Sequence, residues 1–307
     1  MKKVTIFYHR VDFDGIFSCL IANNWYRDEN YYVSLEGYNY GDKLPDPKQL
    51  KIITDEVVIL DVTFPPEVMM KLVETFEDNL TWIDHHLTAI NDSVRFEYSD
   101  KIKGIREINN KGACELTWLW YYPQKMPKII EYISANDVWD KGRLPWNDVM
   151  AVQSGLRAEL GVSLDNILEI GNQIWDEGYL ENTILPIGRN IMKYLKRNWR
   201  TQVKNSAFEI TVAGKLKGLA LLSPDFSSAV FESVVDRNYQ VFCICNIKSD
   251  NPGVFNVGMY SEPDGRLGNF ELGKYMKQNY NGGGHKCAAG GVLSAEQFRK
   301  LVIERII

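Results

Sequence analysis

Three short apolar segments lie in the first third of the chain, at residues 4–8, 57–61 and 80–84. Each is almost continuously apolar and rich in β-branched or aromatic residues, which is typical of strands buried on both faces of a parallel sheet. Residues 15–27 and 65–76 lie between them and are predicted to be helices; the second opens with prolines that suit a first helical turn. Strands that alternate with helices predict an α/β fold with a doubly wound, mainly parallel sheet.

The pattern changes after Lys204. Four strand-like segments follow, at residues 208–214, 218–223, 239–247 and 254–261. A glycine-rich patch then covers residues 281–291. We therefore predict three parts: an α/β domain over residues 1–182, a helical linker over 183–204, and a smaller α/β domain over 205–307.

Composition narrows the class of protein. The chain has 307 residues, of which 45% are hydrophobic and 24% charged, an ordinary globular balance. No apolar run approaches the roughly 20 residues that span a bilayer, so we expect no membrane segment. Five scattered cysteines do not suggest a disulfide framework, which favours a reducing cytoplasm. The net charge of −5 argues against a protein that grips long nucleic acid by its phosphates, and a short or small phosphorylated substrate held locally fits better than a long duplex.

Acidic and histidine residues follow all three early apolar segments. They are His9, Asp12 and Asp14 after the first, Asp61 at the end of the second, and Asp84, His85 and His86 at the end of the third. The carboxyl ends of parallel strands meet at one edge of a sheet, where ligands bind. Carboxylates gathered there repel one another unless cations neutralise them. Mixed imidazole and carboxylate ligands suit Mn²⁺, with Mg²⁺, Co²⁺ or Zn²⁺ as alternatives.

Asp61 stands alone at its strand end and is the natural candidate to bridge two cations. Two metal ions about 3.5–4 Å apart suit the hydrolysis of a phosphate ester. Each residue alone has a simpler interpretation: a lone histidine is often a structural hydrogen bonder, and Asp14 before Gly15 is a plausible helix cap. Three of the four histidines lie at this predicted edge, and the fourth is His285 in the glycine-rich patch. That concentration favours the metal site.

These motifs together resemble those of a known family. Asp84-His85-His86 resembles the signature of the DHH phosphoesterase superfamily, residues 9–15 (HRVDFDG) resemble its first motif, and Asp61 its second. Residues 281–291 (NGGGHKCAAGG) resemble the signature of the DHH-associated C-terminal domain. The resemblance implies a RecJ-like fold similar to that of nano-RNases and bisphosphonucleoside phosphatases.

The resemblance also implies two Mn²⁺ ions and their ligands. One ion would be held by His9, Asp12 and Asp61. The other would be held by Asp14, Asp61, His85 and Asp137, with Asp140 the weaker candidate for the last position. Asp84 would orient a ligand, and His86 would contact the scissile phosphate.

In the C-terminal domain, the resemblance implies contacts between the substrate phosphate and four residues: Gly282, Gly283, Gly284 and His285. Glycines allow the backbone to approach an anion closely, which agrees with this role. The implied reaction is hydrolysis of phosphodiester bonds in short oligonucleotides or small nucleotides by a hydroxide that two metal ions activate. A phosphoanhydride hydrolase of the exopolyphosphatase or pyrophosphatase kind, and a non-catalytic nucleotide-binding regulatory module, stay open as alternatives, as does a homodimer. The strand segment 254–262 lacks the arginine that members degrading short RNAs often carry before the glycine loop.

Overall fold

The computed structural model describes residues 1–303 except 109, 123, 224–227, 235–237, 249–250, 263, 281 and 285. The chain divides into two compact units, Met1–Met192 and Lys193–Ile307. This division lies within one long helix, α10 (Leu185–Ser206). Within the described ranges, no helix is both long and apolar enough to cross a membrane.

The first unit contains a four-stranded sheet. Its strands are β1 (Lys3–His9), β2 (Tyr32–Tyr38), β3 (Glu56–Leu60) and β4 (Leu80–Ile83), in the order β2-β1-β3-β4. All three pairings are parallel. The predicted α/β fold with a parallel sheet is therefore confirmed, and the three apolar segments of the sequence form its three adjacent strands β1, β3 and β4.

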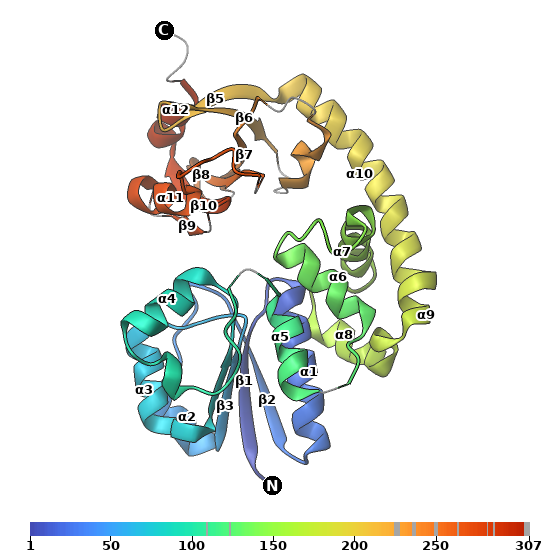
Figure 1. The fold of residues 1–307 in the computed structure, drawn as a ribbon, viewed down its shortest axis with the longest axis vertical. Coiled ribbons are helices and arrows are strands. Elements are labelled where there is room, and N and C mark those ends of the chain that lie inside the picture. Colours follow the sequence, from blue (N-terminus) through green and yellow to red (C-terminus); the bar gives the residue numbers. More distant parts are fainter. Residues whose placement is uncertain are drawn as a thin grey trace. The chain divides into compact units, whose positions relative to one another are not determined.

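Helices cover both faces of this sheet (Figure 1). They are α1 (Phe13–Asp28), α2 (Pro47–Ile53), α3 (Pro66–Phe76), α4 (Leu87–Arg95) and α5 (Ala113–Tyr121). Along β3, Val58 and Leu60 pack into the core that contains α1 and α5, whereas Val57 and Ile59 pack into the core that contains α2 and α3. Both faces are apolar because both are buried, which explains the continuous apolar runs in the sequence.

The rest of the first unit is helical. It comprises α6 (Lys128–Asp137), α7 (Trp146–Leu160), α8 (Leu164–Ile170), a 3₁₀ turn (Gly171–Trp175), α9 (Glu177–Tyr179), a π-helical turn (Leu180–Ile184) and the first part of α10. Gly188 lets α10 approach α7 closely, since a Cβ there would lie 1.7 Å from the carbonyl oxygen of Ala151. Pro186 lies in the first turn of α10, where a proline is tolerated.

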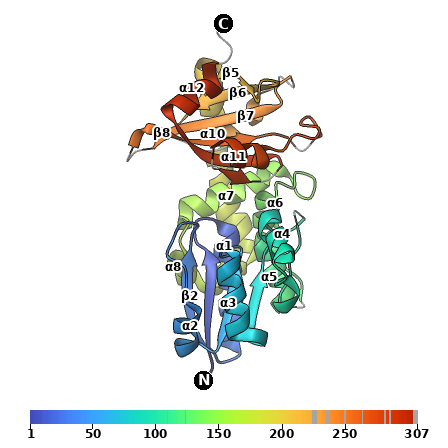
Figure 2. The same ribbon diagram turned by 90° about the vertical axis from the view of Figure 1, so that its left-hand side faces the viewer.

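The second unit contains a six-stranded sheet, the end of α10, a 3₁₀ helix (Ser228–Ser233) and two further α-helices (Figure 2). The strands are β5 (Phe208–Val212), β6 (Leu216–Leu222), β7 (Val241–Lys248), β8 (Asn251–Tyr260), β9 (Gly283–Gly284) and β10 (Ala288–Ser294), in the order β5-β6-β7-β8-β10-β9. Only the pairing of β6 with β7 is parallel among the described strands. Helices α11 (Leu272–Tyr280) and α12 (Ala295–Ile303) share one apolar core with the strands. A smaller α/β unit was predicted here, and the structure has one.

Candidate metal centre

The register of the first sheet aligns the ends of three strands. Tyr8 of β1 pairs with Leu60 of β3, and Leu60 pairs with Ile83 of β4. The next residue of each strand is therefore in the same row, and these residues are His9, Asp61 and Asp84. This row forms the carboxyl edge of a parallel sheet, the edge where ligands bind in open α/β folds.

The first turn of α1 brings two more carboxylates to this edge. Asp12 is the N-cap of α1, and its Oδ1 accepts a hydrogen bond from the Gly15 N–H at 2.9 Å. Asp14 lies inside the first turn and is 2% exposed. Gly15 must be small, because a Cβ there would lie 2.1 Å from the carbonyl oxygen of His9. The capping role considered for Asp14 thus belongs to Asp12, and the Asp14 side chain points elsewhere.

Asp61 directs its two carboxylate oxygens to two different groups of residues. Its Oδ2 lies 3.7 Å from Nδ1 of His9, and its Oδ1 lies 3.3 Å from Nε2 of His85. The residue is 2% exposed and has a φ of +57°, in the left-handed region. Aspartate tolerates this conformation better than most residues, and such backbone strain is concentrated at functional sites.

The first group comprises His9, Asp12 and Asp61. Nδ1 of His9 lies 2.7 Å from Oδ2 of Asp12. On the other side of the ring, Nε2 lies 3.4 Å from Oδ1 of Asn39, which also accepts a hydrogen bond from the Tyr40 N–H. If Nε2 donates to that oxygen in the neutral ring, Nδ1 is left to offer its lone pair to a cation in the group.

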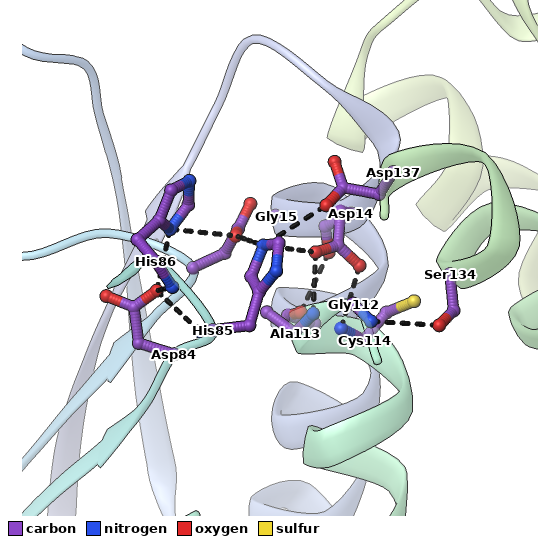
Figure 3. A network of polar contacts seen from close by, with 12 residues as sticks. Asp14, Gly15, Asp84, His85, His86, Gly112, Ala113, Cys114, Ser134 and Asp137 are labelled. Atoms are coloured by element: carbon purple, nitrogen blue, oxygen red, sulfur yellow. Dashed lines mark hydrogen bonds and ion pairs between the residues drawn. The ribbon is translucent and has the colours of Figure 1, made fainter. Parts of the chain in front are cut away.

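The second group comprises Asp14, His85 and Asp137. Nε2 of His85 lies 3.1 Å from Oδ2 of Asp137 and 3.6 Å from Oδ2 of Asp14 (Figure 3). Asp137 ends α6 and so reaches the sheet edge from a different helix. Asp140, its rival in the sequence, instead accepts hydrogen bonds from the N–H groups of Gly142 and Arg143 in the following loop.

Asp84 is occupied by hydrogen bonds within the protein. It is 0% exposed, and its Oδ1 accepts from the N–H of His85 at 2.7 Å, the N–H of His86 at 3.0 Å and Nδ1 of His86 at 2.7 Å (Figure 3). Its Oδ2 accepts from Nε1 of Trp82 at 3.2 Å. Asp84 therefore orients the two histidines that follow it. His86 itself lies with its Nδ1 3.9 Å from Oδ1 of Asp61.

The residues of both groups fit divalent cations. Six buried side-chain polar atoms among the described residues make no hydrogen bond of acceptable geometry, and three of them face other ionisable atoms of these groups: Nδ1 of His9, Oδ1 of Asp61 and Nε2 of His85. A buried polar atom without a partner costs about 1–3 kcal/mol. A cation in each group would give these nitrogen and oxygen atoms the partners that they lack.

Known proteins resemble this chain in structure and not in sequence. No protein-family profile matches the chain, and no curated protein matches it. Among solved structures, the DHH domain of a protein described as a member of a family of ribosomal proteins aligns with a TM-score of 0.58 and 15% identity, over 99% of this chain and 85% of that one. The chain has the fold of a DHH-domain protein.

Two further structures align at lower TM-scores. An uncharacterized protein from Helicobacter pylori has a TM-score of 0.44 and 14% identity, over 98% of this chain and 97% of that one. The exonuclease RecJ bound to manganese has a TM-score of 0.48 and 13% identity, over 98% of this chain and 88% of that one. At these identities the alignments concern the fold alone, and the evidence for a metal centre is the geometry of the candidate ligands in this chain.

The carboxylates and imidazoles of this site strongly shift one another's pKa values. Burial lowers the pKa of His9, but the carboxylates of Asp12 and Asp61 outweigh it and raise that pKa to about 10. Burial likewise lowers the pKa of His85, yet Asp61 and its neighbours raise it to about 10. Burial, with the charges of Asp61 and Asp137, holds the pKa of Asp14 well above its usual range. Without cations, protons therefore neutralise the cluster.

The described glycines of the C-terminal patch have partners within their own unit. The Gly282 N–H donates to the carbonyl oxygen of Met276 at 3.1 Å, and Gly283 and Gly284 form β9, which pairs with β10. A phosphate at the Gly282 N–H would have to replace that bond. His285 lies outside the described residues. The phosphate contacts of this patch stay a prediction.

Two residues that support the centre were not identified from the sequence. Asn39 holds the ring of His9, and Ser134 contacts the helix that binds Asp14. Asn39 follows β2, a strand that was itself not predicted. Ser134 precedes Asp137 by three residues on the same helix, a spacing that places the two side chains on one face. For Ser134 this spacing was the only signal in the sequence, and for Asn39 there was none.

Proposed function

We propose that this protein is a metal-dependent phosphoesterase that binds two divalent cations at the carboxyl edge of its first sheet. The observation that carries the proposal is the position of Asp61. One of its oxygens faces His9 and the other faces His85, at 3.7 and 3.3 Å. A single buried carboxylate shared by two ligand groups is the arrangement that a two-metal site needs.

The ligands of each ion follow from the two groups. One ion would be held by His9, Asp12 and Asp61, and the other by Asp14, Asp61, His85 and Asp137. These mixed imidazole and carboxylate ligands favour Mn²⁺, with Mg²⁺, Co²⁺ and Zn²⁺ as alternatives. When bound, such a pair of cations acidifies water and offsets the negative charge that develops on phosphoryl oxygens.

The chain's own side chains would orient the substrate. Asp84 accepts from Nδ1 of His86 and so fixes the plane of that imidazole beside Asp61. Burial lowers the pKa of His86, but Asp84 and Asp61 outweigh it and raise that pKa to about 9. A cationic His86 would donate a hydrogen bond to an oxygen of the scissile phosphate. The glycines Gly282, Gly283 and Gly284, with His285, are also proposed to contact a substrate phosphate.

The proposed substrates are short oligonucleotides or small nucleotides. A net charge of −5 does not suit a protein that grips a long duplex through many phosphates. A substrate held by one or two phosphates at a cationic centre needs no basic surface, because the bound cations supply the positive charge.

A substrate panel in Mn²⁺ tests the proposal. It compares dinucleotides, longer RNA, single-stranded DNA, bisphosphonucleosides, cyclic dinucleotides and polyphosphate. We expect the fastest hydrolysis on a short nucleotide substrate. Asp61→Asn should lower kcat by more than the roughly 10- to 100-fold typical of residues that only support metal ligands, because it removes the shared ligand. The control is Asp28→Asn, which removes the same charge from an exposed position at the end of α1. Hydrolysis of polyphosphate alone would replace the substrate class, and no Mn²⁺-dependent hydrolysis would overturn the function.

A further inference from the structure

Three residues that are not ligands connect α5, whose first turn binds Asp14, to α6, which carries Asp137. They are Glu115 on α5, Ser134 on α6 and Arg143 in the loop after α6. We propose that Glu115, Ser134 and Arg143 are positioning residues that hold Asp14 and Asp137 at the separation needed for one ion. This inference rests on the proposed function, because it concerns the affinity of the ion assigned to Asp14, His85 and Asp137.

The start of α5 holds Asp14. The N–H of Ala113 donates to Oδ2 of Asp14 at 2.6 Å, and the N–H of Cys114 donates to Oδ1 at 2.9 Å (Figure 3). Gly112, the N-cap, leaves room for this carboxylate, since a Cβ there would lie 2.7 Å from Oδ1. A carboxylate has about four acceptor positions, so each oxygen keeps one for a cation. A movement of the first turn of α5 would therefore move the carboxylate of Asp14 with it.

Ser134 ties that first turn to α6. Its Oγ accepts from the N–H of Gly112 at 2.9 Å and donates to Oε2 of Glu115 at 2.6 Å. Ser134 is 0% exposed and Glu115 is 4% exposed, so water does not compete for these bonds. The N–H groups of residues 112, 113 and 114 thus have separate acceptors: the first bonds to α6, and the other two bond to Asp14.

The same helix carries Asp137 one turn later. Residues three apart on a helix lie on one face, so Ser134 and Asp137 approach the site from the same side of α6. Oδ2 of Asp137 lies 3.1 Å from Nε2 of His85, and Oδ2 of Asp14 lies 3.6 Å from that nitrogen. A shift of α6 along α5 would move Asp137 away from its present position relative to His85 and Asp14. The Ser134 hydroxyl opposes that shift.

Arg143 fixes the chain on the other side of Asp137. Its guanidinium lies 2.5 Å from Oε2 of Glu115, the same oxygen that accepts from Ser134. A buried carboxylate needs a charged partner, and breaking such a pair is strongly destabilising. Asp140 folds the intervening loop by accepting from the Arg143 N–H at 3.2 Å. Asp137 is thus held by Ser134 before it and by Arg143 after it, both through Glu115.

A positioning role differs from general stabilisation in what it changes. If the three residues only stabilise the fold, a variant lowers the unfolding temperature and leaves the affinities of both ions in the folded protein unaltered. If they position Asp14 and Asp137, the variant weakens one ion and leaves the ion at His9 and Asp12 almost unaffected. Changes to residues that support metal ligands typically weaken metal binding about 10- to 100-fold.

The test is a Mn²⁺ titration of the full chain by calorimetry, with the wild type, Ser134→Ala and Glu115→Gln compared. Ser93→Ala is the matched control, since Ser93 is also 0% exposed and its hydroxyl donates to the Ile90 carbonyl at 2.7 Å on α4. We expect two ions in the wild type and in Ser93→Ala. In Ser134→Ala, one dissociation constant should rise about 10- to 100-fold and the other should change less than about twofold.

Activity gives a second readout. The kcat of Ser134→Ala should recover toward the wild-type value at high Mn²⁺, with KM for the substrate unchanged, because only ion occupancy is impaired. Glu115→Gln keeps an acceptor for Ser134 but loses the charge that pairs with Arg143, so its effect should be of the same kind. It also serves as the test if Ser134→Ala does not fold.

The outcomes separate the two proposals. Fewer than two ions in the wild type would overturn the proposed function. Two ions in the wild type, with neither affinity changed in Ser134→Ala and Glu115→Gln, or with both weakened equally, would overturn the positioning role and leave the proposed function intact.

Discussion

Nε2 of His85 lies 3.3 Å from Oδ1 of Asp61, yet neither atom makes a hydrogen bond of acceptable geometry among the residues that the structure describes. Both atoms are buried, and both belong to groups that normally find partners. Their approach is explained if each is a ligand of a cation. The residues around this pair should therefore respond to substitution, pH and cations in specific ways.

Asp84→Asn should impair catalysis more than ion binding. The Asp84 carboxylate accepts four hydrogen bonds, three from the His85–His86 segment and one from Trp82. An amide cannot accept on both sides, so either Trp82 or the histidines would face an N–H group. We expect kcat to fall about 10- to 100-fold, while calorimetry still finds the ion at His9 and Asp12. Wild-type kcat in this variant, with Asp28→Asn as the charge-matched control, would show that Asp84 does not orient His86.

Gly112→Ala should lower the free energy of unfolding of the protein, because the new methyl group would crowd Asp14 of the second group. The backbone φ of Gly112, −68°, accepts any residue, so the cost comes only from the new Cβ, which would lie 2.7 Å from Oδ1 of Asp14. Overpacking of this kind typically costs about 1–3 kcal/mol. The measurement is denaturant unfolding in chelator. The control is Gly142→Ala, where the nearest atom to the new Cβ would lie 3.5 Å away. Equal stability of the two variants would contradict the close fit at Asp14.

The ion-free protein should lose stability as the pH rises. The pKa values of His9 and His85 are raised to about 10, and that of His86 to about 9, from an ordinary value of 6.5. A group whose pKa is raised by folding stabilises the folded state fully below its unfolded pKa, and this contribution is lost as the pH rises through the folded pKa. We therefore expect the unfolding temperature in chelator to fall between about pH 6.5 and 10.

Bound Mn²⁺ should reduce this pH dependence, because cations replace the protons that the imidazoles carry. For the same reason, the apparent dissociation constant of Mn²⁺ should decrease as the pH is raised from about 6.5 to 9. Thermal unfolding in chelator and in Mn²⁺, across that range, measures both effects. A flat unfolding temperature in chelator would mean that His9, His85 and His86 are neutral in the ion-free protein.

Much of the fold and most of the candidate site could be predicted, because the candidate ligands come directly after buried strands in the sequence. The apolar runs before His9, Asp61 and Asp84 are continuous, since both faces of β1, β3 and β4 are covered. Strand register then forces the three residues into one row. The apolar runs and the residues that directly follow them can both be identified in the sequence. The convergence of these side chains could therefore be predicted without knowing how the loops fold.

The parts that were missed have weaker local signals. Strand β2 lies at the edge of the sheet, and Glu36 and Gly37 are exposed, so no apolar run marks it. Asn39 follows that strand, and its contact with His9 depends on the pairing of β2 with β1. Ser134 contacts Gly112, 22 residues away, through the packing of α6 on α5. Such contacts depend on tertiary packing, which periodicity does not encode.

The central claim is that Asp61 bridges two cations, and electron paramagnetic resonance of the Mn²⁺-loaded protein tests it most directly. We predict two ions per chain in the wild type, with the spectrum of an exchange-coupled pair. In Asp61→Asn the coupled spectrum should be lost, and Asp28→Asn should keep it. A single ion per chain, or two ions whose spectrum is uncoupled in the wild type or unchanged in Asp61→Asn, would contradict the bridging role of Asp61.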